Sequence, residues 1–166
     1  SLDYIFGRTD NPQGRLYEYR PKIEQSDPAM EKFVGMCFDP KSPMNERLKE
    51  QGAFIDHFFY CPHHPVHGIG KYKTSCHCRK PETGMFLMAE QYYQVDKTHS
   101  YMVGDKLLDV EAGHNYGIKS VLVGTGYGAE TAAEMTEEEQ KKAFEHYSPD
   151  LLSAAEWIIG EQSSSL

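Results

Sequence analysis

Hydrophobic segments of strand type and of helix type alternate through the second half of the chain. The segment "AFIDHFFYC" (53–61) is rich in aromatic and other strand-forming residues, which indicates a strand. In "TGMFLMAEQYYQ" (83–94) the apolar residues recur at three- and four-residue steps, as in a helix. The strand candidates "SYMVGDK" (100–106) and "KSVLVGTG" (119–126) enclose a helical segment, "LLDVEAGHNYG" (107–117). This alternation predicts an α/β fold with a parallel sheet.

Two further helices are predicted from their capping residues. The segment "SPMNERLKEQG" (42–52) has Ser42 as an N-cap candidate, with proline next to it and glycine at its end. In "TEEEQKKAFEH" (136–146), Thr136 and Glu139 have the spacing of a capping box, on a helix expected to face solvent. Before residue 42 the sequence gives fewer signals: "DYIFG" (3–7) could be a short strand, and "DNPQGRLYEYRP" (10–21) is loop-like by its proline, glycine and asparagine content.

Length and composition predict a single domain that spans residues 1–166, because a chain of this size with 39% hydrophobic residues can bury one core. The net charge of -8 would repel nucleic acid. The apolar segments are too short to cross a membrane, and the start of the chain lacks a basic-then-apolar signal pattern. We therefore expect a cytoplasmic protein with neither nucleic acid nor membrane as a partner, and a monomer.

Cysteine and histidine residues concentrate in "YCPHHPVHGIGKYKTSCHCRKP" (60–81). The two close pairs Cys61-x-His63 and Cys76-x-Cys78 are separated by a loop of twelve residues. Two chelating pairs that close a loop are typical of a structural zinc site, in which three thiolates and one imidazole leave no position open for water. Metal binding would order a loop that has little apolar content of its own.

Two alternatives to this zinc assignment stay open. The first is that the cysteines bind no metal. The second concerns the imidazole, because three further histidines are available as ligands: His64, His67 and His77. Immediately after the last cysteine come Arg79 and Lys80, which are natural partners for a phosphate or a carboxylate.

A second candidate site follows the strand "YMVG". Asp105 lies at its carboxyl end and Asp109 one helical turn later, so both carboxylates can point toward the same edge. Carboxylate oxygens at a strand end suit magnesium. Asp109 has other possible roles: it could orient Lys106, cap the helix or complement the helix dipole. Since ligands bind at the carboxyl ends of parallel strands, this turn and the Cys/His loop are expected to face one site.

The segments "YCPHHP", "CHCRKPETGM" and "YMVGDKLLDVEAG", in this order and spacing, resemble the D-glycero-D-manno-heptose-1,7-bisphosphate 7-phosphatases of the haloacid dehalogenase superfamily. The related histidinol-phosphate phosphatases have similar motifs. The resemblance covers residues 44–159. It implies a Rossmann-like parallel sheet with helices on both faces, without a large cap, and with a zinc-binding loop. It also implies that "AAEWII" (154–159) is the last short strand, although periodicity alone predicts a helix there.

The resemblance also implies roles for individual residues. The zinc ligands would be the four residues of the two pairs: Cys61, His63, Cys76 and Cys78. Lys80 would be the catalytic phosphate-binding lysine, Arg79 and Lys106 substrate contacts, and Asp105 the catalytic magnesium ligand. The implied substrate is a small phosphorylated sugar, hydrolysed through an aspartyl phosphate with a second aspartate as acid and base.

The aspartate pair of that mechanism has no clear counterpart in this chain. In "YIFGRTDNPQG", Gly7 stands where the nucleophile is expected and only Asp10 is nearby. Alternatively, "RTDNPQG" resembles the phosphate loop of the family, and Thr9 would then bind phosphate. Three explanations stay open: a fragment or faulty gene model, a diverged nucleophile loop, or a relative that has lost catalysis. The last would leave a zinc-stabilised protein that binds sugar phosphates or another partner.

Overall fold

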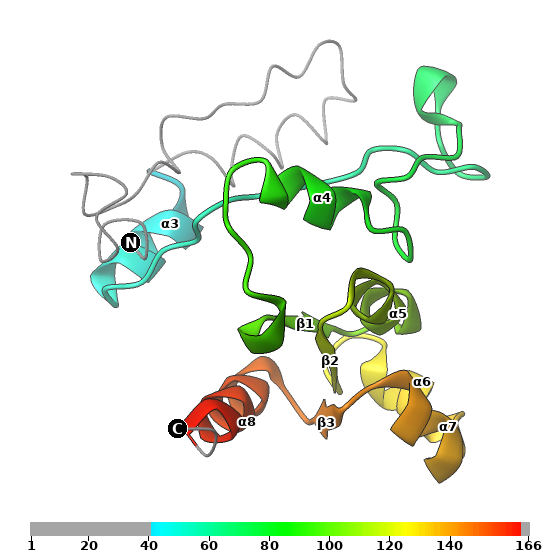
Figure 1. Cartoon of the computed structure of the whole chain (residues 1–166). Helices are drawn as coiled ribbons and strands as arrows, with labels where there is room; N and C mark the ends of the chain where they lie inside the picture. Colours follow the sequence, from blue (N-terminus) through cyan, green and yellow to red (C-terminus); the bar gives the residue numbers. More distant parts are fainter. Residues whose placement is uncertain (1–40, 164–166) are drawn as a thin grey trace. The chain divides into compact units, whose positions relative to one another are not determined.

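The computed structural model describes residues 41–163 (Figure 1). The chain forms two compact units, Ser1–Phe59 and Tyr60–Leu166. The predictions made for "DYIFG", Gly7, Thr9 and Asp10 lie outside the described residues. The single domain expected over 1–166 therefore stays a prediction. Within residues 41–163, no helix is long and apolar enough to span a membrane.

Helix α3 (Pro43–Glu50) is the described helix of the first unit. Its N-cap is Ser42, whose hydroxyl accepts a hydrogen bond from the backbone N–H of Asn45 at 3.2 Å. The chain leaves the helix through Gly52, whose φ of +69° favours glycine. The predicted helix, its cap and its end are confirmed.

The strand predicted over residues 53–61 is wrong, because the structure assigns no strand to this segment. Aromatic and strand-forming residues create a preference only. A strand also needs a neighbour with which its backbone can exchange hydrogen bonds.

A parallel sheet of three strands forms the centre of the second unit. The strands lie in the order β1 (Tyr101–Gly104), β2 (Lys119–Val123) and β3 (His146–Ser148). Gly104 of β1 pairs with Leu122 of β2, so the loops that follow β1 and β2 leave the sheet at the same edge. The predictions of β1 and β2 are confirmed, whereas β3 lies at the end of a segment predicted as helix.

Five α-helices of the second unit accompany the sheet: α4 (Gly84–Glu90), α5 (Leu107–Tyr116), α6 (Gly128–Ala133), α7 (Glu137–Ala143) and α8 (Leu151–Ser163). Two short 3₁₀ turns, η1 (Gly70–Tyr72) and η2 (Lys97–His99), complete it. Helix α5 ends at Gly117, which has a left-handed φ of +88°. The capping box of α7 forms as predicted, since Glu139 accepts the Thr136 N–H at 2.8 Å and Thr136 Oγ1 accepts the Glu139 N–H at 3.3 Å.

The strand expected over "AAEWII" from the family resemblance is wrong, because these residues lie inside α8. Ala154, Trp157 and Ile158 pack together against β2, at the three- and four-residue steps of a helix. The periodicity of the segment had predicted this helix.

Helices cover both faces of the sheet (Figure 1). On one face, Leu122 packs with Val110 of α5 and with Phe144. On the other face, Val121 and Val123 pack against α8. Because side chains alternate along β2, one short strand contributes to both core clusters. The predicted Rossmann-like fold class is confirmed.

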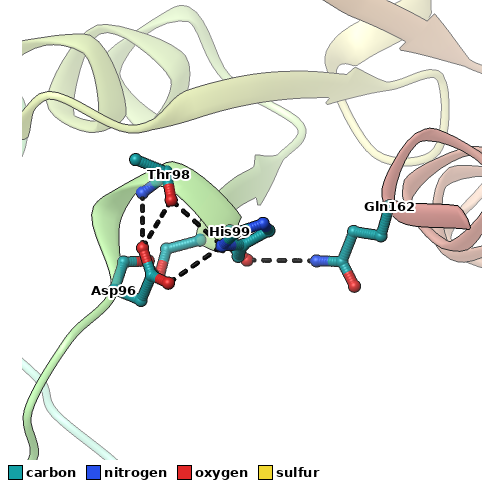
Figure 2. A network of polar contacts seen from close by, with 5 residues as sticks. Asp96, Thr98, His99 and Gln162 are labelled. Carbon is teal, nitrogen blue, oxygen red and sulfur yellow. Dashed lines mark hydrogen bonds and ion pairs between the residues drawn. The ribbon is translucent and has the colours of Figure 1, made fainter. Parts of the chain in front are cut away.

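A polar network precedes β1 at the η2 turn (Figure 2). The carboxylate of Asp96 accepts hydrogen bonds from the hydroxyl and the backbone N–H of Thr98, at 2.6 and 3.0 Å, and lies 2.8 Å from His99 Nδ1. These contacts hold the pKa of Asp96 at about 2, chiefly through the Thr98 hydroxyl. Gln162 of α8 donates to the His99 carbonyl at 3.2 Å and so ties this turn to the C-terminal helix.

Candidate metal centre and phosphate site

Three of the four predicted zinc ligands converge on one point. The ligand atoms of Cys61, His63 and Cys76 all lie within 4.8 Å of one another. The Cys61 sulfur is 3.7 Å from His63 Nδ1. The donor set of two sulfurs and one imidazole is soft and suits zinc, so these residues fit the metal that the spacing predicted.

Cys78 lies beside this cluster rather than within it. Its backbone N–H donates to the Cys76 sulfur at 3.3 Å, while its own sulfur is 3.8 Å from the sulfur of Met88 in α4. The hydrogen bond from the Cys78 N–H lowers the pKa of Cys76, whereas burial raises the pKa values of Cys61 and Cys78. A lowered pKa favours the thiolate, the form of cysteine that binds metals.

The neighbouring histidine His64 has a different task. Its Nδ1 accepts hydrogen bonds from the backbone N–H groups of Val66 and His67, at 3.1 and 2.9 Å, and so shapes the loop. The ring of His67 lies beside that of His64, with the centroids 4.6 Å apart. Among the described histidines, His63 is the one that joins the cysteine cluster, which favours it over His64, His67 and His77 as the imidazole ligand.

Arg79 and Lys80 leave the cysteine loop in different directions. Arg79 Nη1 donates to the carbonyl of His63 at 3.1 Å, so the guanidinium braces the cysteine loop. Lys80 forms an ion pair with Asp109, the carboxylate at the start of α5. The Lys80 side chain keeps 36% of its surface exposed, whereas that of Asp109 keeps 8%. The Lys80 ammonium is thus held by the buried carboxylate of Asp109 and remains accessible to solvent.

Asp109 also caps α5, because its Oδ2 accepts the backbone N–H of Lys106 at 3.2 Å. Capping was one of the roles left open for this residue, and the pairing with Lys80 is a role that the sequence did not indicate. A Cβ at Gly104 would overlap the Asp109 side chain. Glycine at the end of β1 therefore makes room for the buried carboxylate.

Asp105 follows β1 directly and faces the loop after β2. Its Oδ2 accepts the backbone N–H of Tyr127 at 3.1 Å. Between β2 and Tyr127, Gly126 has a φ of +65°, and a Cβ there would overlap the Asp105 carboxylate. A half-buried carboxylate held at the carboxyl end of a strand fits a magnesium ligand.

Lys106 extends toward the same loop, with its Nζ 4.4 Å from the centroid of the Tyr127 ring. The sequence reasoning missed Tyr127. The signal that could have found it is its place in the loop after the second strand, because loops after neighbouring parallel strands meet at one edge. The structure thus brings four charged side chains to this edge: Lys80, Asp105, Lys106 and Asp109.

Comparisons with known proteins agree with this fold. A family model described as HAD-hydrolase-like matches residues 77–154. The D-glycero-beta-D-manno-heptose-1,7-bisphosphate 7-phosphatase of Vibrio cholerae is 45% identical over 84 residues, covering 50% of this chain and 45% of the relative. The enzyme of the same name from Escherichia coli K12 is 35% identical over 138 residues, covering 81% of this chain and 62% of the relative.

A solved structure is also similar. It is the D,D-heptose 1,7-bisphosphate phosphatase from B. bronchiseptica complexed with magnesium and phosphate, and it matches with a TM-score of 0.60 and 31% identity over 81% of this chain and 66% of that chain. The chain therefore belongs to the haloacid dehalogenase-like hydrolases. Within that class, the relatives it matches are heptose-bisphosphate phosphatases, and it spans about half to two thirds of their length.

Proposed function

We propose that this chain is a phosphatase of the heptose-bisphosphate type, which removes the 7-phosphate of D-glycero-D-manno-heptose 1,7-bisphosphate. The observation that carries the proposal is the convergence of Lys80, Asp105 and Lys106 at the carboxyl edge of β1. Two cations and one carboxylate at a strand end can hold a phosphate group together with a divalent cation. The named relatives support the choice of a phosphorylated heptose as substrate.

In this proposal each residue of the edge has a defined task. Asp105 would hold magnesium, which supplies positive charge to the transferring phosphoryl group when it is bound. Asp109 keeps the Lys80 ammonium in place, and that ammonium would bind the phosphate oxygens. Lys106, which follows Asp105 in the loop after β1, would bind the same group. Thr9, predicted as a further phosphate contact, stays a prediction.

The zinc site has a structural task in this proposal. Zinc bound by Cys61, His63, Cys76 and Cys78 would fix the loop that ends at Arg79 and Lys80. Arg79 would brace the loop through the His63 carbonyl and contact the substrate only with its remaining N–H groups. A monomer in the cytoplasm is the setting in which we expect this activity.

A second candidate function follows from the sequence itself. Its 166 residues contain no Asp-x-Asp pair, the arrangement that the family uses as nucleophile and general acid. Lys80 and Lys106 could bind a phosphate without that pair, so the second candidate is a zinc-stabilised protein that binds a sugar phosphate without hydrolysing it. A histidinol-phosphate phosphatase is a variant of the first proposal with another phosphomonoester.

Phosphate release from zinc-loaded protein tests these proposals. We expect magnesium-dependent release from heptose 1,7-bisphosphate that exceeds release from histidinol phosphate and from p-nitrophenyl phosphate. Asp105→Asn should lower the rate by about 100-fold or more, because the charge that stabilises the transition state is lost, while the zinc content stays unchanged. If the protein releases phosphate from none of these substrates, the proposed phosphatase activity is contradicted. Binding of heptose 1,7-bisphosphate that depends on Lys80 would then support the second candidate, and no binding would contradict both.

A further inference from the structure

The loop that follows β2, Gly124–Tyr127, contacts both residues that follow β1. Through its backbone N–H, Tyr127 binds the carboxylate of Asp105, and through its ring it contacts the ammonium of Lys106. Asp105 and Lys106 are adjacent in sequence and both contact this one residue. One tyrosine therefore connects the candidate magnesium ligand with a candidate phosphate-binding cation.

The backbone of this loop fixes where the tyrosine lies. Gly126 has a left-handed φ of +65°, and any side chain there would overlap the Asp105 carboxylate. Gly128, just after the tyrosine, is buried, and a Cβ there would overlap the carbonyl of Val123. Glycine on both sides of Tyr127 therefore lets the backbone pass close to the Asp105 carboxylate and to the end of β2.

The tyrosine side chain has no core to fill. Its exposed fraction is 58%, so hydrophobic burial does not explain its place. The contact that it makes is with Lys106, whose Nζ lies 4.4 Å from the ring centroid, within the range of a cation–π interaction. Lys106 is itself exposed, and a lysine on the surface would otherwise sample many rotamers.

We propose that Tyr127 is a positioning residue that holds the ammonium of Lys106 beside Asp105, so that a phosphate group meets a cation already in place. The proposal rests on the proposed function, since it names how that same site binds its phosphate. One side of the ammonium faces the ring, and its remaining N–H groups stay available to phosphate oxygens. The lysine then loses less conformational freedom when the phosphate binds.

The experiment compares Tyr127→Leu with Tyr127→Phe in zinc-loaded protein with magnesium. Leucine removes the aromatic face and keeps the backbone N–H to Asp105, whereas phenylalanine keeps both. The affinity for inorganic phosphate should fall about two- to five-fold in Tyr127→Leu, the range of an exposed cation–π contact, and stay within about 1.5-fold of wild type in Tyr127→Phe.

Nuclear magnetic resonance of labelled lysine gives a readout that needs no ligand. The ε-protons of Lys106, assigned by their loss in Lys106→Met, should be shifted upfield by the tyrosine ring current. The shift should persist in Tyr127→Phe and disappear in Tyr127→Leu. In a Lys106→Met background, Tyr127→Leu should change phosphate affinity by less than about 1.5-fold, because the ring acts through the lysine.

Three results would overturn the inference. The first is the absence of the upfield shift in wild type. The second is wild-type phosphate affinity that Tyr127→Leu leaves unchanged. The third is an equal loss with and without Lys106, which would mean that the ring contacts the phosphate ligand directly. If wild type binds no phosphate at all, the proposed function fails and this role fails with it, a result distinct from the second.

Discussion

At the scale of single residues, the ion pair between Lys80 and Asp109 shows how a charge can be made available by burying its partner. The carboxylate is almost fully buried, and it is compensated by the ammonium and by the backbone N–H of Lys106. A buried carboxylate without such partners would be costly. Because Lys80 remains partly exposed, the ion pair leaves its ammonium accessible at the carboxyl edge of the sheet, where Asp105 also lies.

The Asp96 network gives a prediction for pH dependence (Figure 2). The pKa of Asp96 is lowered from 3.8 to about 2, first by the Thr98 hydroxyl and then by His99. A lowered pKa means that the folded state prefers the carboxylate, so its contribution to stability is complete above pH 3.8 and is lost as the pH falls toward about 2. Asp96→Asn should therefore lower the urea midpoint near neutral pH, and the difference should shrink as the pH falls through about 2.

The control for this measurement is Glu156→Gln, which removes an exposed carboxylate elsewhere, on α8. It should not reproduce the pH-dependent difference. Since the Asp96 side chain keeps 63% of its surface exposed, salt should weaken the effect of Asp96→Asn. A difference in midpoint that stays constant from neutral pH down to about pH 2 would contradict the assigned pKa.

At the scale of elements, helix α5 packs against the sheet at a glycine, Gly113. Gly113 is buried, and a Cβ there would overlap the hydroxyl of Ser120 in β2 and approach the side chain of Met102 in β1. The Ser120 hydroxyl is itself bound to the carbonyl of Val110 at 2.8 Å. Because Gly113 has no side chain, the last turn of α5 can lie close to β1 and β2.

We predict opposite effects for two glycine-to-alanine changes. Gly113→Ala should lower the free energy of unfolding by about 1–3 kcal/mol, because the new methyl group overpacks the interface between helix and sheet. Gly160→Ala, in α8, has open space for its Cβ and should raise that free energy by about 0.5–1 kcal/mol. Urea unfolding followed by the fluorescence of Trp157, the only tryptophan in the sequence, measures both. Equal effects of the two changes would contradict the close packing of α5.

At the scale of the whole molecule, the Cys/His loop has no core of its own. None of the residues from Cys61 to Cys78 is fully buried. Hydrophobic packing therefore cannot order the loop, and a bound metal would have to do so. The order of this loop matters for the site because it ends at Lys80, which reaches Asp109 across 29 residues of sequence.

Loss of one ligand should accordingly cost both metal and stability. We expect Cys76→Ser to abolish stoichiometric zinc and to lower the free energy of unfolding by at least about 2 kcal/mol, or roughly 4–8 °C in melting temperature. Chelation of zinc from wild type should produce the same fall. Asp105→Asn serves as the control and should retain zinc with an unchanged melting temperature. Full zinc retention by Cys76→Ser would refute the ligand set.

The parts of this protein that the sequence determined are those with local causes. The capping residues Ser42, Thr136 and Gly117 marked the helix ends, since a cap binds backbone groups within a few residues of itself. The apolar segments of the sequence predicted β1 and β2, and the segment that ends at Gly117 predicted α5, because these patterns also depend only on neighbouring residues. The spacing of the two ligand pairs indicated a metal loop, because chelation by near neighbours is also local.

Only the tertiary structure decided what depends on residues far apart in sequence. A strand exists where another strand binds its backbone, which is why β3 forms and residues 53–61 do not become a strand. The pairing of Lys80 with Asp109 and the contacts of Tyr127 with Asp105 and Lys106 arise where the loops of the sheet meet. Sequence spacing cannot encode such contacts, because they depend on how the helices and strands pack.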